Sequence, residues 1–227
     1  MAGFPNELLW FGFLLLNFVA ITAISRFLGR PGLYVWIAIA GITANIQVTK
    51  TIELFGLTAT LGNIVYAGSF LVTDILSEVY GERSARKGVL LGFISIITFT
   101  VFMYISLLFA PDANDFAQPH LKAIFSLLPR ISVAGLTAYG ISQTHDVWAY
   151  QFWRRRFPRH LWLRNNLSTL VSQLIDSLVF TIAAFVGVFP TPVLVEIVVT
   201  TYLFKGIVAI LDTPFLYLSK RYSRRDD

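Results

Sequence analysis

Several ionisable side chains lie inside long apolar stretches of the sequence, where such residues are rare. Asp176 and Lys205 fall near the centres of two stretches, and Asp74 and Asp146 fall about one helical turn from the centres of two others. A charged side chain at the centre of a membrane helix costs about 3 kcal/mol. Four such groups facing lipid would cost roughly 12 kcal/mol, comparable to the stability of a whole domain. We therefore expect them to face the interior of a helix bundle.

Five apolar segments each carry polar residues. The pairs are Asn45 and Lys50, Asp74 and Glu78, Gln143 and Asp146, Gln173 and Asp176, and Lys205 and Asp212. The members of the last four pairs are three, four or seven residues apart, so each pair shares one face of a helix. The groups are either interhelical ties, each worth about 0.6–2 kcal/mol, or parts of a solute site near the membrane midplane. We favour the solute site, because an intramembrane ionisable residue is a functional hypothesis by default.

Aromatic and small residues give weaker indications. Four rings could stack on a planar solute, although in a chain with 20 Phe most aromatic side chains are expected to pack or to face lipid; they are Tyr66, Phe70, Tyr139 and Tyr202. Gly88 and Gly92 form a small-xxx-small pair, which predicts a close helix contact rather than a ligand site.

The composition restricts the class of protein. The chain has 227 residues, of which 56% are hydrophobic and 14% charged, whereas a soluble domain carries about 25% charged residues. This excludes a disordered chain and argues against a soluble enzyme. Without cysteine, disulfides and Cys-ligated metals are excluded, and the three histidines have no metal-ligand spacing. We expect no metal and no cofactor.

Seven apolar segments would position the polar residues. The predicted helices cover residues 7–25, 33–53, 61–80, 88–110, 130–152, 166–188 and 192–218. A helix of about 20 residues crosses the hydrocarbon core of a bilayer, which is about 30 Å thick. The predicted fold class is therefore all-α, a polytopic transmembrane helical bundle of seven helices.

The basic residues predict the orientation. Fourteen of the 18 Lys and Arg follow the first, third, fifth and seventh helices, whereas the opposite side keeps Lys122 and Arg130. The positive-inside rule then places the N-terminus outside and the C-terminus in the cytoplasm. The basic loops thus indicate membrane topology rather than nucleic-acid binding, and the lipid bilayer is a partner of the chain.

Longer motifs resemble a known family. They include Asn45-Ile-Gln-Val-Thr-Lys50, Phe70-Leu-Val-Thr-Asp74-Ile-Leu-Ser-Glu78-Val-Tyr-Gly81, Ala138 to Gln143 with Asp146, Trp162 to Ser168, Ser172 to Ser177, and Tyr202 to Lys205 with Thr213-Pro214. Together they resemble the queuosine precursor transporter family, also called the vitamin uptake transporter family, over about residues 33–218.

The resemblance implies a domain organisation and a function. Residues 33–218 would form a six-helix transporter core related to the substrate-binding subunits of vitamin importers. Residues 1–32 would add an N-terminal helix and a cytoplasmic loop, and residues 219–227 a cytoplasmic basic tail. The implied function is import of a 7-deazapurine queuosine precursor (preQ0, preQ1 or queuine) for tRNA modification, across a bacterial plasma (inner) membrane.

The resemblance also implies site residues. With Arg164 as a further family position, the candidate substrate-binding residues are Asn45, Lys50, Asp74, Glu78, Gln143, Asp146, Gln173, Asp176 and Lys205. A 2-amino-6-oxo deazapurine presents adjacent N–H donors, which the carboxylate of Asp74 or Asp176 could accept as a pair. The aminomethyl group of preQ1 could instead claim an acid. Lys205 could neutralise an acid or donate to the ring carbonyl.

The sequence leaves the energy source of transport open and makes an enzyme less compatible. The chain has no Walker A motif, so it would act either as a secondary carrier or as a substrate-binding subunit of an importer energised by a separate ATPase. No feature of the sequence demonstrates such an ATPase, and a homo-oligomer is compatible with it. An intramembrane enzyme is disfavoured, because the chain lacks Gly-x-Gly-Asp, Gly-x-Ser-x-Gly and His–Glu metal motifs.

Overall fold

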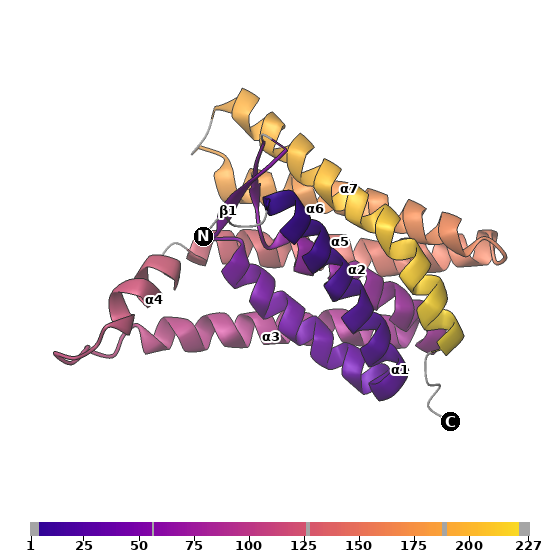
Figure 1. The fold of residues 1–227 in the computed structure, drawn as a ribbon, viewed down its shortest axis with the longest axis horizontal. Helices are drawn as coiled ribbons and strands as arrows, with labels where there is room; N and C mark the ends of the chain where they lie inside the picture. Colours follow the sequence, from indigo (N-terminus) through magenta and orange to yellow (C-terminus); the bar gives the residue numbers. More distant parts are fainter. Residues whose placement is uncertain (1–4, 56, 126–127, 188–189, 223–227) are drawn as a thin grey trace.

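The computed structural model describes residues 5–55, 57–125, 128–187 and 190–222, which form a helical bundle with a small hairpin (Figure 1). In chain order the elements are α1 (Asn6–Gln47), β1 (Thr51–Leu54), β2 (Leu57–Thr60), α2 (Asn63–Ile75), η1 (Leu76–Tyr80, a π-helix), α3 (Glu82–Ser106), α4 (Ala117–Phe125), α5 (Leu128–Arg156), α6 (Leu161–Phe185) and α7 (Thr191–Tyr222). The fold class predicted from the sequence, an all-α polytopic bundle, is confirmed.

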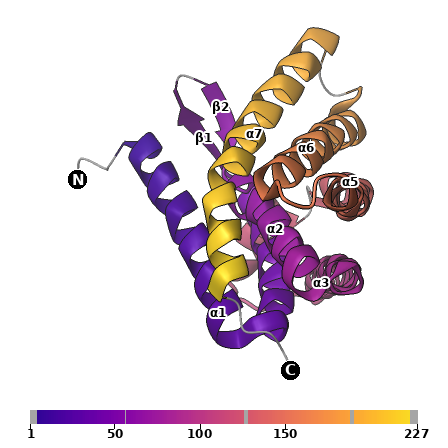
Figure 2. The same cartoon turned by 90° about the vertical axis from the view of Figure 1, so that its right-hand side faces the viewer.

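Helix α1 is two helices joined at a sharp bend. Gly29 has φ 60° and ψ −147°, a backbone conformation that is essentially restricted to glycine, and Pro31 follows in the first turn of the second arm. Figure 2 shows the two arms running in opposite directions from this bend. They correspond to the predicted helices 7–25 and 33–53, but the second arm ends at Gln47.

A two-stranded antiparallel hairpin replaces the end of the predicted second helix. Strands β1 and β2 pair Thr51 with Thr60 and Leu54 with Leu57. The prediction of helix through residue 53 is therefore wrong, because this threonine-rich segment pairs with itself. As a consequence, Lys50 lies in the turn before β1 with its side chain exposed, and not inside a membrane helix.

The remaining predicted helices are present with shifted ends. Together, α2 and η1 occupy residues 63–80, whereas α3 begins six residues before the predicted 88 and α6 five residues before the predicted 166. Both of these extensions carry charged or amide side chains. Hydropathy therefore leaves these residues out of the predicted membrane span, although the helix includes them. The structure adds the short helix α4, which was not predicted, in the loop between the fourth and fifth predicted helices.

The bundle has two chemically different ends. The hairpin, α4 and the start of α1 lie at one end, on the left of Figure 1, and the α1 bend and the α5–α6 connection lie at the other. The second end carries the basic residues at the helix termini, among them Arg83, Arg154, Arg164 and Lys220. We call it the basic end and the first the hairpin end.

Exposure is distributed as in a membrane protein. Large apolar side chains face outward, such as Leu90, Ile94 and Phe102 of α3, while Asp74, Gln143 and other polar groups are buried. Within the described residues, four helices are long and apolar enough to span a membrane, and five if α4 and α5 form one bent span. The bent helix α1 counts once here although it has two arms. The chain is thus a multi-pass membrane protein.

Helix α2 lies in the middle of the bundle. Eleven of its 13 residues are buried, and it packs against both α1 and α7. An apolar core of Leu14 and Phe18 from α1, Ile64 and Leu71 from α2, and Val208 from α7 fixes these helices. The polar face of α2 is thereby directed to α5 and α6. The division of the chain at residue 32 stays a prediction.

A candidate substrate site inside the bundle

The carboxylate of Asp176 joins four helices inside the bundle. Oδ1 of Asp176, on α6, accepts hydrogen bonds from the Tyr66 hydroxyl of α2 and, at 3.1 Å, from the Ser142 hydroxyl of α5. Oδ2 forms an ion pair with the Lys205 ammonium of α7. Asp176 and Lys205 are only 2% and 3% exposed. We call these four residues the Asp176 cluster.

Aromatic rings border this cluster. The Lys205 ammonium lies 4.9 Å from the centroid of the Tyr66 ring. Tyr66 contacts Phe70 and Tyr139 edge to face, with ring centroids 5.9 and 6.0 Å apart. Three of the four predicted stacking rings therefore meet beside the ion pair, whereas Tyr202 is partly exposed on α7.

Two buried glutamines lie close to the Asp176 cluster in sequence. Gln143, next to Ser142, accepts a hydrogen bond from Thr73 and donates one to Ser69, each at 3.2 Å. Gln173 precedes Asp176 by three residues, so the two share one face of α6. Gln173 is fully buried, and neither its amide nitrogen nor its amide oxygen has a hydrogen-bond partner among the described residues. Such an amide costs about 1–3 kcal/mol, so stability does not explain it.

A second polar layer lies toward the basic end. Asp74 follows Tyr66 by eight residues, which corresponds to about 12 Å along a helix. The Thr169 hydroxyl donates to Asp74 at 3.1 Å, and the Asn165 amide donates to Asp212 at 3.1 Å. Asp146 follows Ser142, which donates to Asp176, by one turn of α5 toward the basic end, so it lies on the face of α5 that packs against α6. We call Asp74, Asp146 and Asp212 the acid layer.

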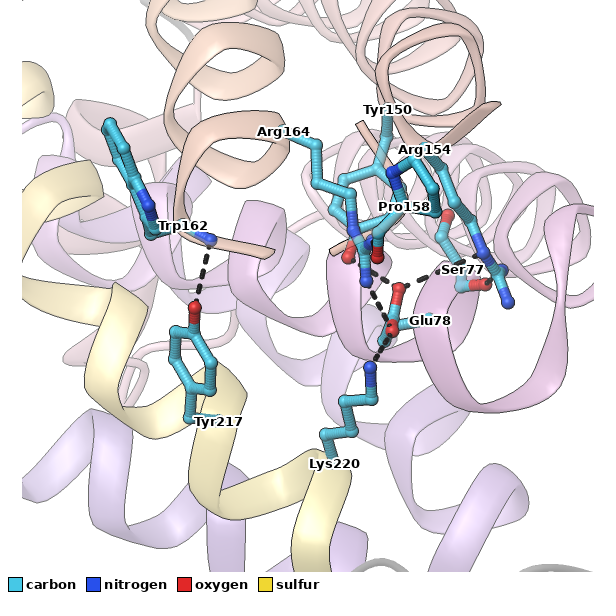
Figure 3. Close-up of polar contacts among 9 residues, drawn as sticks. All are labelled: Ser77, Glu78, Tyr150, Arg154, Pro158, Trp162, Arg164, Tyr217 and Lys220. Atoms are coloured by element: carbon cyan, nitrogen blue, oxygen red, sulfur yellow. Dashed lines mark hydrogen bonds and ion pairs between the residues drawn. The ribbon is translucent and has the colours of Figure 1, made fainter. Parts of the chain in front are cut away.

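A third layer ties the basic end together around Glu78. Its carboxylate accepts hydrogen bonds from Arg164 at 2.5 Å and from the Tyr150 hydroxyl at 3.1 Å, and pairs with Lys220 at 2.6 Å. Arg154 approaches to 3.9 Å. Figure 3 shows these side chains converging on Glu78 from α5, α6 and α7. With several cations satisfying it, Glu78 acts as an interhelical tie.

Comparison with known proteins identifies the family. Residues 60–219 match a family model described as "Putative vitamin uptake transporter". The chain is 45% identical over 224 residues to the "Probable queuosine precursor transporter" of Bacillus subtilis (strain 168), which covers 98% of each chain. The chain belongs to the vitamin uptake transporter family.

A second relative is more distant. The "Queuosine precursor transporter" of Escherichia coli (strain K12) is 29% identical over 175 residues, which covers 74% of this chain and 76% of that protein. No solved structure matches the chain. Since the family and the relatives are transporters, the chain is a membrane transporter of a small molecule and not an enzyme. The resemblance noted from the sequence motifs is confirmed.

The structure distributes the predicted site residues over several places in this transporter. Asp176 and Lys205 are in contact, Gln143 adjoins Ser142 of the same cluster, and Gln173 precedes Asp176 by three residues. Asp74 and Asp146 form part of the acid layer, and Glu78 is an interhelical tie. Asn45 is partly exposed, and its amide donates to Gly41 of its own helix at 2.9 Å. Lys50 is exposed and directly precedes β1 of the hairpin.

The candidate acids and Lys205 lie at different levels of the bundle. Asp176 and Lys205 are in direct contact, and Asp74 belongs to a different layer. A cavity of about 450 Å³ is lined by Arg30, Tyr34, Arg83 and Lys87 at the basic end, away from these acids.

Sequence reasoning missed several partners of the acids. It did not anticipate that Tyr66 and Ser142 bind Asp176 through their hydroxyls, or that Asn165 binds Asp212. A signal for Asn165 was available, because it lies four residues before Thr169 and eleven before Asp176, on the same helix face.

Proposed function

We propose that this transporter imports a 7-deazapurine queuosine precursor and that the Asp176 cluster recognises its ring. The relatives' names support the substrate class. The observation that carries the site is a buried carboxylate held by donors from three other helices, close to a glutamine whose amide has no partner among the described residues.

The chemistry of the cluster suits a 2-amino-6-oxo ring. The adjacent N–H donors of such a ring can replace Lys205 and Tyr66 on the two oxygens of Asp176. The freed Lys205 ammonium would then donate to the ring carbonyl. The amides of Gln173 and Gln143 can serve the remaining donors and acceptors of the ring.

The aromatic border gives the site its preference for a flat ligand. Stacking a planar heterocycle against Tyr66, Phe70 or Tyr139 adds apolar contact that a linear polyamine or an amino acid does not provide. The proposed site therefore requires both a flat ring and paired N–H donors. preQ0, preQ1 and queuine all meet this requirement, and guanine tests the role of the deaza position.

The proposal includes an orientation and a location. The transporter would lie in the bacterial plasma membrane with its N-terminus outside and the basic end in the cytoplasm, because four of its helix termini there carry Arg or Lys. The substrate would enter from the hairpin end and reach Asp176 before the acid layer.

A binding titration tests the substrate and the site together. Purified protein in detergent is titrated with preQ0, preQ1, queuine and guanine, using the wild type, Asp176→Asn and, as a matched control, Glu196→Gln. Glu196 is an exposed acid near the start of α7. We expect the wild type and Glu196→Gln to bind at least one precursor. Asp176→Asn leaves Lys205 buried without its anion, so we expect it to be destabilised and, in the fraction that stays folded, to lose that binding.

Other outcomes would contradict parts of this proposal. Absence of binding to all four compounds, or equal binding of unrelated vitamins, would reject the substrate class. Wild-type affinity in Asp176→Asn would reject the site. Uptake by liposomes that contain only this chain would exclude a mandatory ATPase partner.

A further inference from the structure

Three buried carboxyl groups in the acid layer lack a cation. Asp74 of α2, Asp146 of α5 and Asp212 of α7 are each 0% exposed. Among the ion pairs of the described residues, none involves these three acids. The cost of burying an unpaired carboxylate is so high that the group normally becomes protonated instead.

The basic and titratable groups around the layer are already engaged. Toward the hairpin end, Lys205 is paired with Asp176. Toward the basic end, Arg164 and Lys220 are paired with Glu78, to which Tyr150 also donates. On α5, the His145 ring contacts the Ser172 hydroxyl at 2.9 Å.

The layer is also short of hydrogen-bond donors. Four carboxyl oxygens have no hydrogen-bond partner among the described residues: Oδ1 of Asp74, Oδ1 and Oδ2 of Asp146, and Oδ2 of Asp212. The carbonyl oxygen of Asn165 is likewise unpartnered and fully buried, although the same amide contacts Asp212 through its nitrogen. All five atoms are acceptors when the acids are ionised.

Nearby hydroxyl groups are committed elsewhere. Ser168 donates to the backbone oxygen of Asn165 at 3.1 Å, and Ser172 to that of Ser168 at 2.8 Å. Thr169 satisfies one oxygen of Asp74. A proton on a carboxyl group would supply the missing donor, since a protonated carboxyl group can donate to its neighbour.

We propose that the acid layer is the proton-binding site that couples substrate import to a proton gradient, with Asp146 as its principal acceptor. Asp146 is chosen because both of its oxygens lack a hydrogen-bond partner among the described residues and because it lies one turn of α5 after Ser142, on the face that packs against α6. A proton fits better than a metal ion, since the described residues contain no group of three acids or histidines arranged to hold a metal. The proposal rests on the transport function proposed above.

Shared helices connect this layer to the substrate. Helix α2 carries Tyr66 of the Asp176 cluster and Asp74 of the acid layer, and α6 carries both Asp176 and Thr169. When a ligand displaces Tyr66 from Asp176, α2 loses a contact with α6 at one level, and this changes the contact between Asp74 of α2 and Thr169 of α6 at the next level. Protonation of the acid layer and ligand binding at the Asp176 cluster thus both shift the equilibrium between alternative arrangements of α2 and α6.

Purified protein in liposomes tests the coupling directly. Liposomes loaded with the pH dye pyranine are given a substrate that binds in the titration above, and the internal pH is followed with and without an imposed gradient that is acidic outside. Asp146→Asn is compared with the wild type and with Glu196→Gln. A gradient of one pH unit sustains about tenfold accumulation if one proton enters per substrate.

We expect the wild type and Glu196→Gln to acidify the lumen when substrate is added and to accumulate it along the gradient. Asp146→Asn should lose both effects and should still bind substrate and exchange it across the membrane. Asp74→Asn serves as the second variant if Asp146→Asn does not fold.

Each remaining outcome contradicts a defined claim. Wild-type protein that binds and exchanges substrate without moving protons, or a variant that keeps full proton-driven accumulation, would overturn the coupling site and leave the proposed function standing. Accumulation driven by a sodium gradient instead would overturn the proton as the coupling ion. Wild-type protein that binds no precursor would overturn the proposed function itself.

Discussion

Buried carboxylates in this bundle are stabilised in three different ways. Glu78 is surrounded by cations, Asp176 has one ammonium and two hydroxyl donors, and Asp146 has neither. Burying an ion pair gains little net stability, but removing one partner is strongly destabilising. The same substitution, an acid to its amide, is therefore expected to change the stability by different amounts in different layers.

Glu78→Gln should destabilise the protein. Arg164 is 2% exposed, and the substitution removes its carboxylate partner without changing the size of the side chain. Loss of one member of a buried pair costs about 3–5 kcal/mol. We expect a clear fall in the thermal unfolding midpoint, measured in detergent.

Glu82→Gln is the matched control for this prediction. Glu82 pairs with Arg86 at 2.7 Å on the surface of α3, where the two side chains are 34% and 50% exposed. Exposed pairs contribute about 0–1 kcal/mol, so the unfolding midpoint should hardly move. Equal shifts for the two variants would show that Glu78 is not an interhelical tie.

Lys205→Met should destabilise the protein, and Asp176→Asn should rescue it. The single change leaves Asp176 buried without its cation, at a cost of about 3–5 kcal/mol. The double variant has no charge left to compensate and should recover most of this loss, as measured by thermal unfolding of all four combinations. Failure of the rescue would mean that Lys205 stabilises the bundle mainly through its contact with the Tyr66 ring.

At the scale of elements, small residues set the distance between α3 and its neighbours. A Cβ atom built on Gly92 would lie 2.5 Å from the Tyr139 hydroxyl oxygen and 2.6 Å from Cγ2 of Ile37. A Cβ atom on Gly88 would meet Leu76 at 2.8 Å and Ile37 at 2.9 Å. The close helix contact predicted for Gly88 and Gly92 is therefore confirmed.

Gly92→Ala should push α3 away from α1 and α5. Overpacking of this kind costs about 1–3 kcal/mol, which thermal unfolding can measure. Gly206→Ala in α7 is the control, since its Cβ would make an ordinary 3.5 Å contact with Leu170 and alanine favours helix by about 1 kcal/mol. A destabilised control or an unaffected Gly92→Ala would contradict this account of the packing.

The sequence predicted the elements as far as hydropathy is informative. Apolar segments and the break near Pro31 give the spans, because both depend on local composition. The hairpin was missed because residues 51–53 were assigned to the end of a helix and residues 54–60 to the break before the next one, and pairing between two short strands is a tertiary choice that hydropathy does not report. The π-helix from Leu76 to Tyr80 has no local signature that distinguishes it from α-helix.

The sequence predicted which helix face carries the site residues, but not which residues they contact. Spacing placed Gln173 and Asp176 on one buried face of α6, and burial confirms it. The pairing of cations with acids depends on how deep each side chain lies in the bundle. The sequence gives helix ends only to within several residues, so it leaves each depth uncertain by more than one helical turn. Thus the pairing of Lys205 with Asp176, and of Arg164 with Glu78, required the structure.

At the scale of the whole molecule, polarity is inverted relative to a soluble protein. Exposed leucine, isoleucine and phenylalanine cover the outside, and the buried polar layers lie inside. The basic residues at the helix termini gather at one end, which also holds the Glu78 tie. This asymmetry predicts which end faces the cytoplasm.

Cysteine labelling checks that orientation cleanly, because the chain contains no cysteine of its own. Ala113→Cys lies in the exposed loop between α3 and α4, and Arg159→Cys in the exposed connection between α5 and α6 at the basic end. A membrane-impermeant maleimide should label position 113 in intact cells and position 159 only after permeabilisation. The reverse pattern would invert the topology, and then a substrate arriving from outside would meet the acid layer before Asp176.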